Sequence, residues 1–162
     1  MDIGNKDIIL RNAVRAVIID GDKILMAHLQ KTDEYKFPGG GRNKSESVEE
    51  ALEREVSEEV GYKVKKIGDK IGIITEYDTA KEGGNSIFKM ISEYYLVEIE
   101  NTQLKQSLED YELELLFTPC WTEVKTAYEA NMDKIIRKIN TTPGIKRETI
   151  ALGKLLNEYH KR

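Results

Sequence analysis

The sequence has a single cysteine, Cys120, in a chain of 162 residues. One cysteine excludes an intramolecular disulfide and a cluster of thiolate metal ligands. Neither histidine lies near it in the sequence, so nothing supports a cysteine nucleophile activated by an imidazole. The neighbours Phe117, Pro119 and Trp121 predict that Cys120 is a structural side chain packed among them.

Long apolar runs and an excess of positive charge are also missing. No stretch is long and apolar enough to span a bilayer, and the amino terminus lacks the basic and apolar regions of a signal peptide. The formal net charge of −4 provides no basic surface for a nucleic-acid backbone. We therefore expect a soluble, cytoplasmic monomer or homodimer whose partner is neither a membrane nor a nucleic-acid polymer.

The apolar content of the chain is enough for one core. Hydrophobic residues make up 40% of the 162 positions, which suffices for one domain and leaves little for a second. No internal repeat or low-complexity segment divides the sequence. We expect a single domain over residues 1–162.

The most informative stretch runs from Gly40 to Tyr62. At about 100° per residue, its middle forms a helix with an apolar stripe made of Val48, Ala51, Leu52 and Val56. Glu55, Glu58 and Glu59 fall within about 100° of arc that overlaps this stripe. Carboxylates placed in this way repel one another and lose hydration. A hard divalent cation such as Mg²⁺, which takes oxygen ligands, offsets that cost.

The same acidic residues have a simpler explanation. Glutamate is a good helix former, and pairs four residues apart such as Glu50 with Arg54 support a solvated helix. Glu49, Glu50 and Glu53 are expected on that solvated face. Charge count alone favours this explanation, so the metal site depends on the spacing of the whole segment.

That spacing matches a known motif. Five residues separate Gly40 from Glu46, and seven more lead to Arg54, which begins the run REVSEEVGY. The segment resembles the Nudix box, G-x5-E-x7-R-E-U-x-E-E-x-G-U with U aliphatic, of the MutT-like pyrophosphohydrolases. All seven fixed positions match, while Tyr62 replaces the last aliphatic residue and Ser45 replaces the usual glycine before Glu46.

The resemblance implies an α/β fold, specifically a Nudix-type α/β/α sandwich with a mixed sheet and a loop-helix-loop catalytic motif at residues 40–62. It implies Mg²⁺-dependent hydrolysis of a pyrophosphate bond in a nucleoside diphosphate linked to another group, with Mn²⁺ as a substitute cofactor. The metal ligands it implies are the side chains of Glu55, Glu58 and Glu59 and a backbone carbonyl near Gly40, less directly Gly39. Glu46 and Arg54 match positions that brace the loop against the helix.

The general base is left open between two regions. In some members of the family the first glutamate of the R-E-U-x-E-E run serves, which here is Glu55. In others the base or an extra metal ligand is a carboxylate from a later loop. Glu112 is the candidate there, with Glu109, Asp110 and Glu114 as rivals.

The residues that determine which substrate is bound are expected outside the motif. Arg15, Phe37 and Tyr77 are candidate substrate-binding residues, although Phe37 is explained equally well by a loop anchored to the core. ADP-ribose-type members often carry a proline about fifteen residues beyond the box, where this chain has Tyr77 and Asp78. The absence of that proline disfavours ADP-ribose as the substrate, whereas Tyr77 favours dinucleoside polyphosphates. Nucleoside triphosphates stay among the candidate substrates.

A protein that senses a nucleotide without turning it over is the alternative function. Such modules typically lose glutamates of the box, whereas this chain keeps all four. The hydrolase is therefore favoured. The substrate in either case is a small nucleotide or nucleoside-diphosphate derivative.

Periodicity and turn residues predict the other elements. We expect a hairpin of strands at 14–19 and 23–29, a helix that ends at Gly61, and a second hairpin of strands at 64–74 and 87–99. Gly83 and Gly84 fall in the loop of that second hairpin. A short strand is expected at 113–117, a helix capped by Thr122 after it, and a last helix at 147–159.

Overall fold

The computed structural model describes residues 6–79, 85–139 and 141–159. The loop expected at Gly83 and Gly84 lies outside the described residues. In chain order the elements are β1 (Asp7–Val17), β2 (Ile19–Asp20), β3 (Lys23–Leu29), β4 (Glu34–Lys36), β5 (Gly39–Gly41), α1 (Val48–Val60), β6 (Tyr62–Thr79), β7 (Ser86–Gln103), α2 (Asp110–Glu114), β8 (Phe117–Glu123), α3 (Val124–Ile136) and α4 (Ile145–Tyr159).

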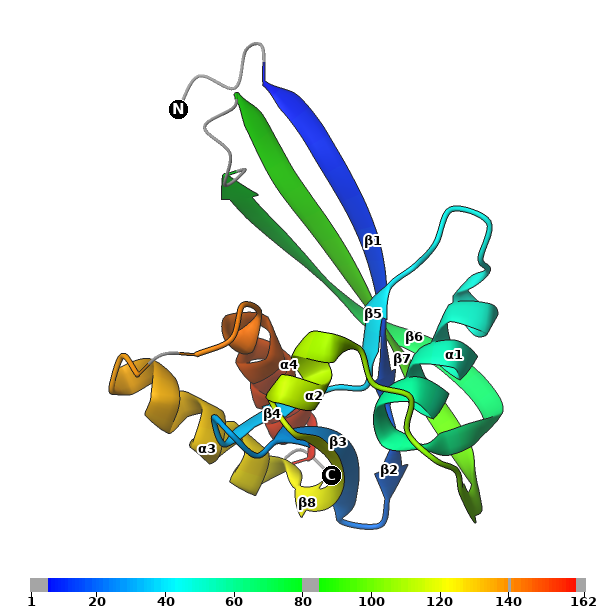
Figure 1. Cartoon of the computed structure of the whole chain (residues 1–162). Coiled ribbons are helices and arrows are strands. Elements are labelled where there is room, and N and C mark those ends of the chain that lie inside the picture. The colour runs from blue at the N-terminus through cyan, green and yellow to red at the C-terminus, as the bar shows by residue number, and fades with distance from the viewer. Residues whose placement is uncertain (1–5, 80–84, 140, 160–162) are drawn as a thin grey trace.

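The strands form two sheets (Figure 1). The first has the order β5-β1-β7-β6 and is mixed, because β1 and β7 are parallel while the other pairs are antiparallel. In the second, β3 pairs antiparallel with β2, β4 and β8. The predicted α/β class with a mixed sheet is confirmed. The second sheet was not predicted.

β1 supplies side chains to two hydrophobic cores on its opposite faces. Val14 and Ala16 pack with α1 in one core, and Val17 packs with α3 and α4 in the other. Side chains alternate between the faces of a strand, so a single strand separates the two helical layers. This places helices on both sides of the mixed sheet, as expected.

α1 begins and ends where its sequence dictates. The Ser47 hydroxyl accepts a hydrogen bond from the Glu50 amide at 3.1 Å, which satisfies one of the free amides of the first turn. Gly61 ends the helix with φ 71°, a left-handed conformation that glycine adopts without strain. The predicted end of the helix at Gly61 is confirmed, and Leu52 and Val56 are fully buried.

Of the two predicted hairpins, one is confirmed and the other is shorter than expected. The pairing of β6 with β7 is confirmed, with several shifts in register between Tyr62 and Gly72. The first hairpin is shorter than expected, because residues 7–17 belong to β1 in the other sheet and only Ile19–Asp20 pairs with β3. The apolar run at 14–19 is thus divided between two strands.

The strand predicted at 113–117 is wrong. Residues 110–114 form α2, and the strand β8 starts at Phe117. Leu113 and Leu116 are exposed, so this short apolar run does not reflect burial in a sheet. Thr122 does not cap a helix either, since it lies within β8 and Glu123 occupies the cap position of α3.

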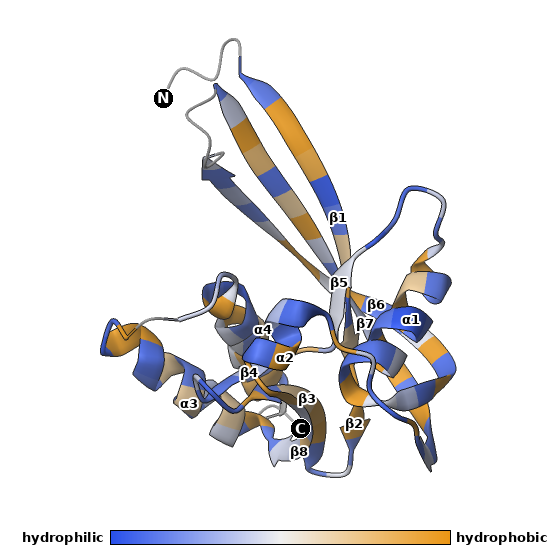
Figure 2. Cartoon of the chain, viewed as in Figure 1, coloured by the Kyte–Doolittle hydropathy of each residue, from blue (hydrophilic) through white to orange (hydrophobic). Residues whose placement is uncertain are grey.

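The outer ends of three strands extend away from the rest of the protein (Figure 1). We call this segment the arm and define it as residues 7–12 of β1, 73–79 of β6 and 86–92 of β7. Apolar residues recur along it (Figure 2). Among the described residues, no helix is long and apolar enough to cross a membrane.

Candidate active site

A cavity of about 880 Å³ opens between α1, the arm, α2 and the start of α4. Its lining has two chemically different ends. The acidic end contains Glu55, Glu58, Glu59, Glu109 and Glu112. The other end contains Arg11, Arg15 and Arg147 together with Glu76 and Asp78. A cavity of this size suits a small-molecule ligand.

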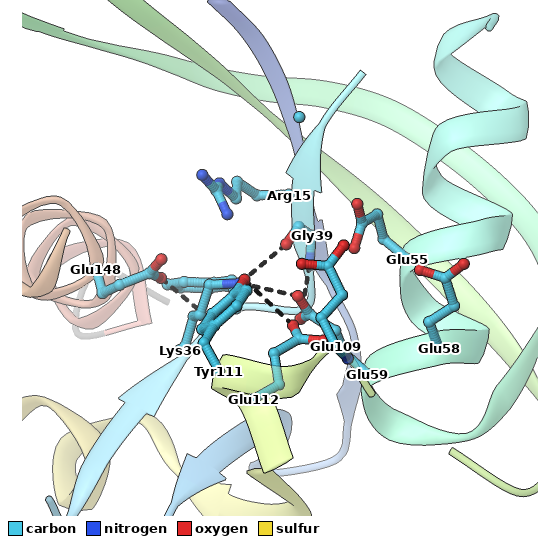
Figure 3. A network of polar contacts seen from close by, with 12 residues as sticks. Arg15, Lys36, Gly39, Glu55, Glu58, Glu59, Glu109, Tyr111, Glu112 and Glu148 are labelled. Carbon is cyan, nitrogen blue, oxygen red and sulfur yellow. Dashed lines mark hydrogen bonds and ion pairs between the residues drawn. The ribbon is translucent and has the colours of Figure 1, made fainter. Parts of the chain in front are cut away.

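Glu59 is the most deeply placed carboxylate of the acidic end. Its side chain is 2% exposed, and its Oε1 lies 2.9 Å from Lys36 Nζ. The Gly39 amide donates to its Oε2 at 3.2 Å, and Figure 3 shows both contacts. Burial raises the pKa of Glu59 to about 7, because the favourable charge of Lys36 does not offset the lost hydration and Glu112 adds repulsion.

Glu55 and Glu58 lie beside it on the same face of α1 (Figure 3). Burial raises the pKa of Glu55, and the nearby charge of Glu59 adds to the shift. Arg54 Nη1 donates to Glu55 Oε1 at 2.9 Å and to Glu58 Oε2 at 3.4 Å. Three carboxylates of one helix thus face one end of the cavity, each with a cationic side chain as its present partner.

The same arginine holds the preceding loop. Arg54 Nε and Nη2 donate to the two oxygens of Glu46 at 2.6 and 3.0 Å, and Nη2 also donates to the Gly41 carbonyl at 3.2 Å. The hydrogen bonds from Arg54 lower the pKa of Glu46 to about 2. This geometry is that of a brace between loop and helix, as the sequence motif implied.

Two glycines let the loop backbone reach the site. Gly39 has φ +155°, and a Cβ there would collide with the Val14 carbonyl of the neighbouring strand. A Cβ on Gly40 would lie 2.6 Å from Glu55 Oε1. Glycine at both positions therefore allows β5 to pair with β1 while its backbone passes close to the carboxylates.

The acidic end fits a hard divalent cation by its donor chemistry. Carboxylates and a nearby backbone carbonyl are the oxygen ligands that Mg²⁺ prefers, and burial disfavours their charge when no cation is bound. In their present rotamers, no three His, Cys, Asp or Glu side chains of the described segments already converge as a coordination sphere. Glu55 and Glu58 would exchange Arg54 for the metal, and Glu59 would exchange Lys36.

Of the four carboxylates considered as a later base or ligand, only Glu109 and Glu112 line the cavity within the described residues. Glu112 is buried on α2, accepts from the Glu109 amide at 2.8 Å, and raises the pKa of Glu59 through its charge. Glu109 also lines the cavity, whereas Asp110 and Glu114 are exposed outside it. The position of Glu112 beside Glu59 is visible in Figure 3.

Arg15 is buried in the wall of the cavity at 3% exposure. Its polar contacts within the described ranges are long: Nε to Ser92 Oγ at 3.5 Å and Nη2 to Met90 Sδ at 3.7 Å. No acidic side chain of those ranges forms an ion pair with it. A buried guanidinium without a carboxylate partner is costly and is suited to an anionic ligand.

Phe37 and Tyr77 lie elsewhere. Phe37 is fully buried and packs edge-on against Tyr94, with ring centroids 5.4 Å apart. Tyr77 is 66% exposed on the arm, with Lys89 Nζ 5.6 Å from its ring centroid. Neither lines the cavity, so the expectation that these rings bind substrate does not match their placement. The structural alternative for Phe37 explains its burial.

Sequence reasoning missed several residues of the cavity. Lys36 belongs to a segment that reads as a polar loop, and nothing local signals its contact with Glu59. Arg147 pairs with its neighbour Glu148, whose Oε1 lies at 3.0 Å, and with Glu76 of the arm, whose Oε2 lies at 2.7 Å. The pairings of Lys36 with Glu59 and of Arg147 with Glu76 join residues 23 and 71 positions apart and carry no sequence signature.

The chain matches the family model for the NUDIX domain over residues 9–140. It therefore belongs to the Nudix family of pyrophosphohydrolases. No curated protein sequence matched it.

Solved structures support the same fold. A NUDIX hydrolase from Nitrosomonas europaea has a TM-score of 0.58 and 18% identity, over 90% of this chain and 88% of its own. A MutT NUDIX hydrolase from Burkholderia pseudomallei has a TM-score of 0.55 and 19% identity, over 72% and 84%. A UDP-X diphosphatase has a TM-score of 0.55 and 18% identity, over 72% and 52%. At these identities the likeness concerns the fold.

Proposed function

We propose that the protein hydrolyses a pyrophosphate bond in a small nucleoside-diphosphate derivative with Mg²⁺ as cofactor and Mn²⁺ as a substitute. The observation that carries the proposal is that Glu55, Glu58 and Glu59 line one end of a cavity whose wall also holds Arg15. One end suits a divalent cation and the other suits an anion. A ligand that bridges them has phosphate groups between the two.

Glu55, Glu58 and Glu59, with a carbonyl near Gly40, would hold the metal. When bound, Mg²⁺ neutralises phosphate charge and makes water easier to deprotonate. Arg15 binds and orients a phosphate that is not attacked, because a guanidinium matches the geometry of phosphate oxygens. Charge neutralisation and positioning are the main requirements for cleaving a phosphate anhydride.

Two carboxylates compete for the role of general base. Glu112 Oε1 is held by the Glu109 amide, while its Oε2 has only a long contact of 3.4 Å with the Tyr111 hydroxyl. That oxygen has capacity to accept a proton from water. Glu55 is the alternative, since Arg54 engages only its Oε1 in the described contacts. Removal of each carboxylate in turn, with the pH profile recorded, distinguishes them.

Among substrates, nucleoside triphosphates and dinucleoside polyphosphates are favoured over ADP-ribose. The preference rests on the residues that follow the motif, where no proline occurs between Tyr62 and Asn85. Tyr77 gives dinucleoside polyphosphates no support, because its ring lies on the opposite face of the arm from the cavity. The cavity volume of about 880 Å³ accommodates either favoured class.

The test is release of phosphate or pyrophosphate from a panel of nucleoside triphosphates, dinucleoside polyphosphates, ADP-ribose and nucleotide sugars. Each substrate is assayed with Mg²⁺, with Mn²⁺ and with a chelator. Turnover that requires metal and is restricted to one class supports the proposal and names the substrate. Saturable binding without turnover across the panel contradicts it and favours a nucleotide sensor instead.

A further inference from the structure

The two faces of the arm differ in character. Side chains alternate along each strand, and the register of β1 with β7 and of β7 with β6 assigns them to faces. The cavity face carries Ile9, Arg11, Glu76, Asp78, Phe88 and Met90. The outer face carries six apolar side chains, Ile8, Leu10, Ile73, Tyr77, Ile87 and Ile91, together with Asn12, Thr75, Thr79 and Lys89. All members of the first set except Ile9 line the cavity, whereas none of the second does.

The outer face is apolar and largely open. Ile8 is 58% exposed, Leu10 54% and Ile73 50%. None of the six apolar side chains of this face belongs to either hydrophobic core. A three-stranded sheet gains independent stability from a hydrophobic face or from packing against another element. The cavity face mixes Ile9, Phe88 and Met90 with three charged side chains of the cavity wall, whereas the outer face has six aliphatic or aromatic side chains. The outer face is therefore the one expected to pack against another surface.

We propose that the outer face of the arm packs against the same face of a second copy of the chain. Lys89 is the one charged side chain on this face of the arm, and its ammonium already lies over the Tyr77 ring. A nearly neutral, apolar face meets an identical face with little charge repulsion, but offers nothing to a strongly charged partner. Two-fold pairing of one patch with itself is the commonest form of assembly among soluble oligomers.

The dimensions of the face suit a small interface. β1 contributes six residues, and β6 and β7 contribute seven each, so the face is roughly 20 to 23 Å long. Three strands about 4.8 Å apart give a flat footprint of roughly 330 Å² per copy, and the protruding side chains enlarge the accessible area beyond that value, so the contact is at the small end of specific interfaces. The residues that flank the base of the arm add to this area.

The unpaired edge of β1 is a second reason to expect a contact at the arm. β5 pairs with β1 only from Ala13 to Arg15, so residues 7–12 have no strand on their outer side within the part of the chain that the structure describes. Exposed apolar edge strands promote uncontrolled association. A defined two-fold contact beside this edge restricts access to it.

The test compares the association state of the wild-type protein with that of single variants by sedimentation equilibrium at about 1 to 100 μM. Leu10→Glu and Ile91→Glu place a charge on the outer face, and Ile136→Glu places the same charge on α3 at a side chain that is 70% exposed. We expect a dimer for the wild type and for Ile136→Glu. Each arm variant should raise the dissociation constant by about a hundredfold or more, because a charge would be buried without a partner. A monomeric wild type, or arm variants that stay dimeric, overturns the proposal.

Cross-linking keeps the proposal testable if a charged variant fails to fold. Ile91→Cys lies at the centre of the outer face, and Cys120→Ser removes the native thiol in the same chain. Sheets stacked face to face lie about 10 Å apart, which is too far for many disulfides, so a bifunctional thiol reagent that spans roughly 10 Å should link two copies through position 91. Ile136→Cys in the same background is the control. No cross-linked dimer, or equal amounts in the two variants, contradicts the two-fold contact.

Discussion

Lys36 Nζ lies 2.9 Å from Glu59 Oε1, and the side chain of that glutamate is 2% exposed. A buried carboxylate beside an ammonium would ordinarily have a lowered pKa. Here burial dominates, and the pKa of Glu59 rises to about 7. In the metal-free protein this glutamate therefore binds its proton more tightly in the folded than in the unfolded state.

The consequence is a specific dependence of stability on pH. Because the folded pKa is raised from 4.5 to about 7, the contribution of Glu59 is fully present below about pH 4.5 and is lost as pH rises through about 7. The free energy of unfolding of the wild type relative to Glu59→Gln should fall over that window and level off above it. Urea denaturation with a chelator, from about pH 4 to pH 8, measures this. A difference that stays constant contradicts the shifted pKa.

Glu58 and Glu53 form a matched pair for testing metal binding. Both are on α1, but Glu58 lines the cavity while Glu53 is exposed on the solvent side. Glu58→Gln should lower metal-dependent turnover by about a hundredfold or more. It should change the free energy of unfolding by less than about 1 kcal/mol, because the side chain is 35% exposed. Glu53→Gln should leave both unchanged, and full activity in Glu58→Gln would remove this residue from the metal ligands.

The brace between Arg54 and Glu46 is testable by a double-mutant cycle. Lysine cannot reproduce the two-pronged hydrogen bonds of arginine, so Arg54→Lys and Glu46→Gln should each cost about 1 to 2 kcal/mol of stability. The double variant should cost clearly less than the sum, since both changes remove one interaction. Additive costs would show that the two side chains act independently.

Gly39 should tolerate no side chain. Gly39→Ala forces a Cβ against the Val14 carbonyl in a conformation that alanine rarely adopts, and we expect a loss of about 3 kcal/mol or more. Gly72 is the control, because a Cβ there meets no atom within 4 Å and its φ is not positive. Thermal denaturation of both alanine variants measures the effect. Equal stability would show that β5 can shift away from β1 without cost.

Arg15→Met should change stability and substrate binding in opposite directions. Arg15→Met removes a buried charge without a carboxylate partner, so the ligand-free protein should be at least as stable as the wild type. The same change should raise KM by about tenfold or more, with a smaller effect on kcat, because the lost contact binds a phosphate that does not react. The KM of Arg15→Lys should lie between the KM of the wild type and that of Arg15→Met. An unchanged KM in Arg15→Met would exclude this residue from the substrate site.

Local patterns were sufficient to predict the acidic end of the site. The apolar stripe, the glutamates and the terminating Gly61 all lie within one helix, where periodicity determines which side chains share a face. The other end depends on contacts between distant residues. Arg15 and Ser92, for example, are 77 positions apart and meet because β1 and β7 pair in parallel. No pattern within either strand indicates that register.

The failure at residues 113–117 has a different cause. A run of five apolar or acidic residues is too short for periodicity to distinguish a helix from a strand. The segment divides between the end of α2 and the start of β8. Thr122 was misassigned for a related reason, since a capping residue and a strand residue look alike without knowledge of where the strand ends.

At the proposed metal site, the contacts of Arg54 with Glu55 and Glu58 would make metal uptake an exchange of counter-ions. Without metal, a guanidinium already neutralises part of the acidic face, so the helix keeps its shape and the carboxylates are not left to repel one another. An incoming cation would have to displace this guanidinium, which would lower its net affinity. A monovalent ion such as Na⁺ or K⁺ would gain less from the exchange than a divalent ion, because the attraction of the carboxylates scales with the charge of the ion.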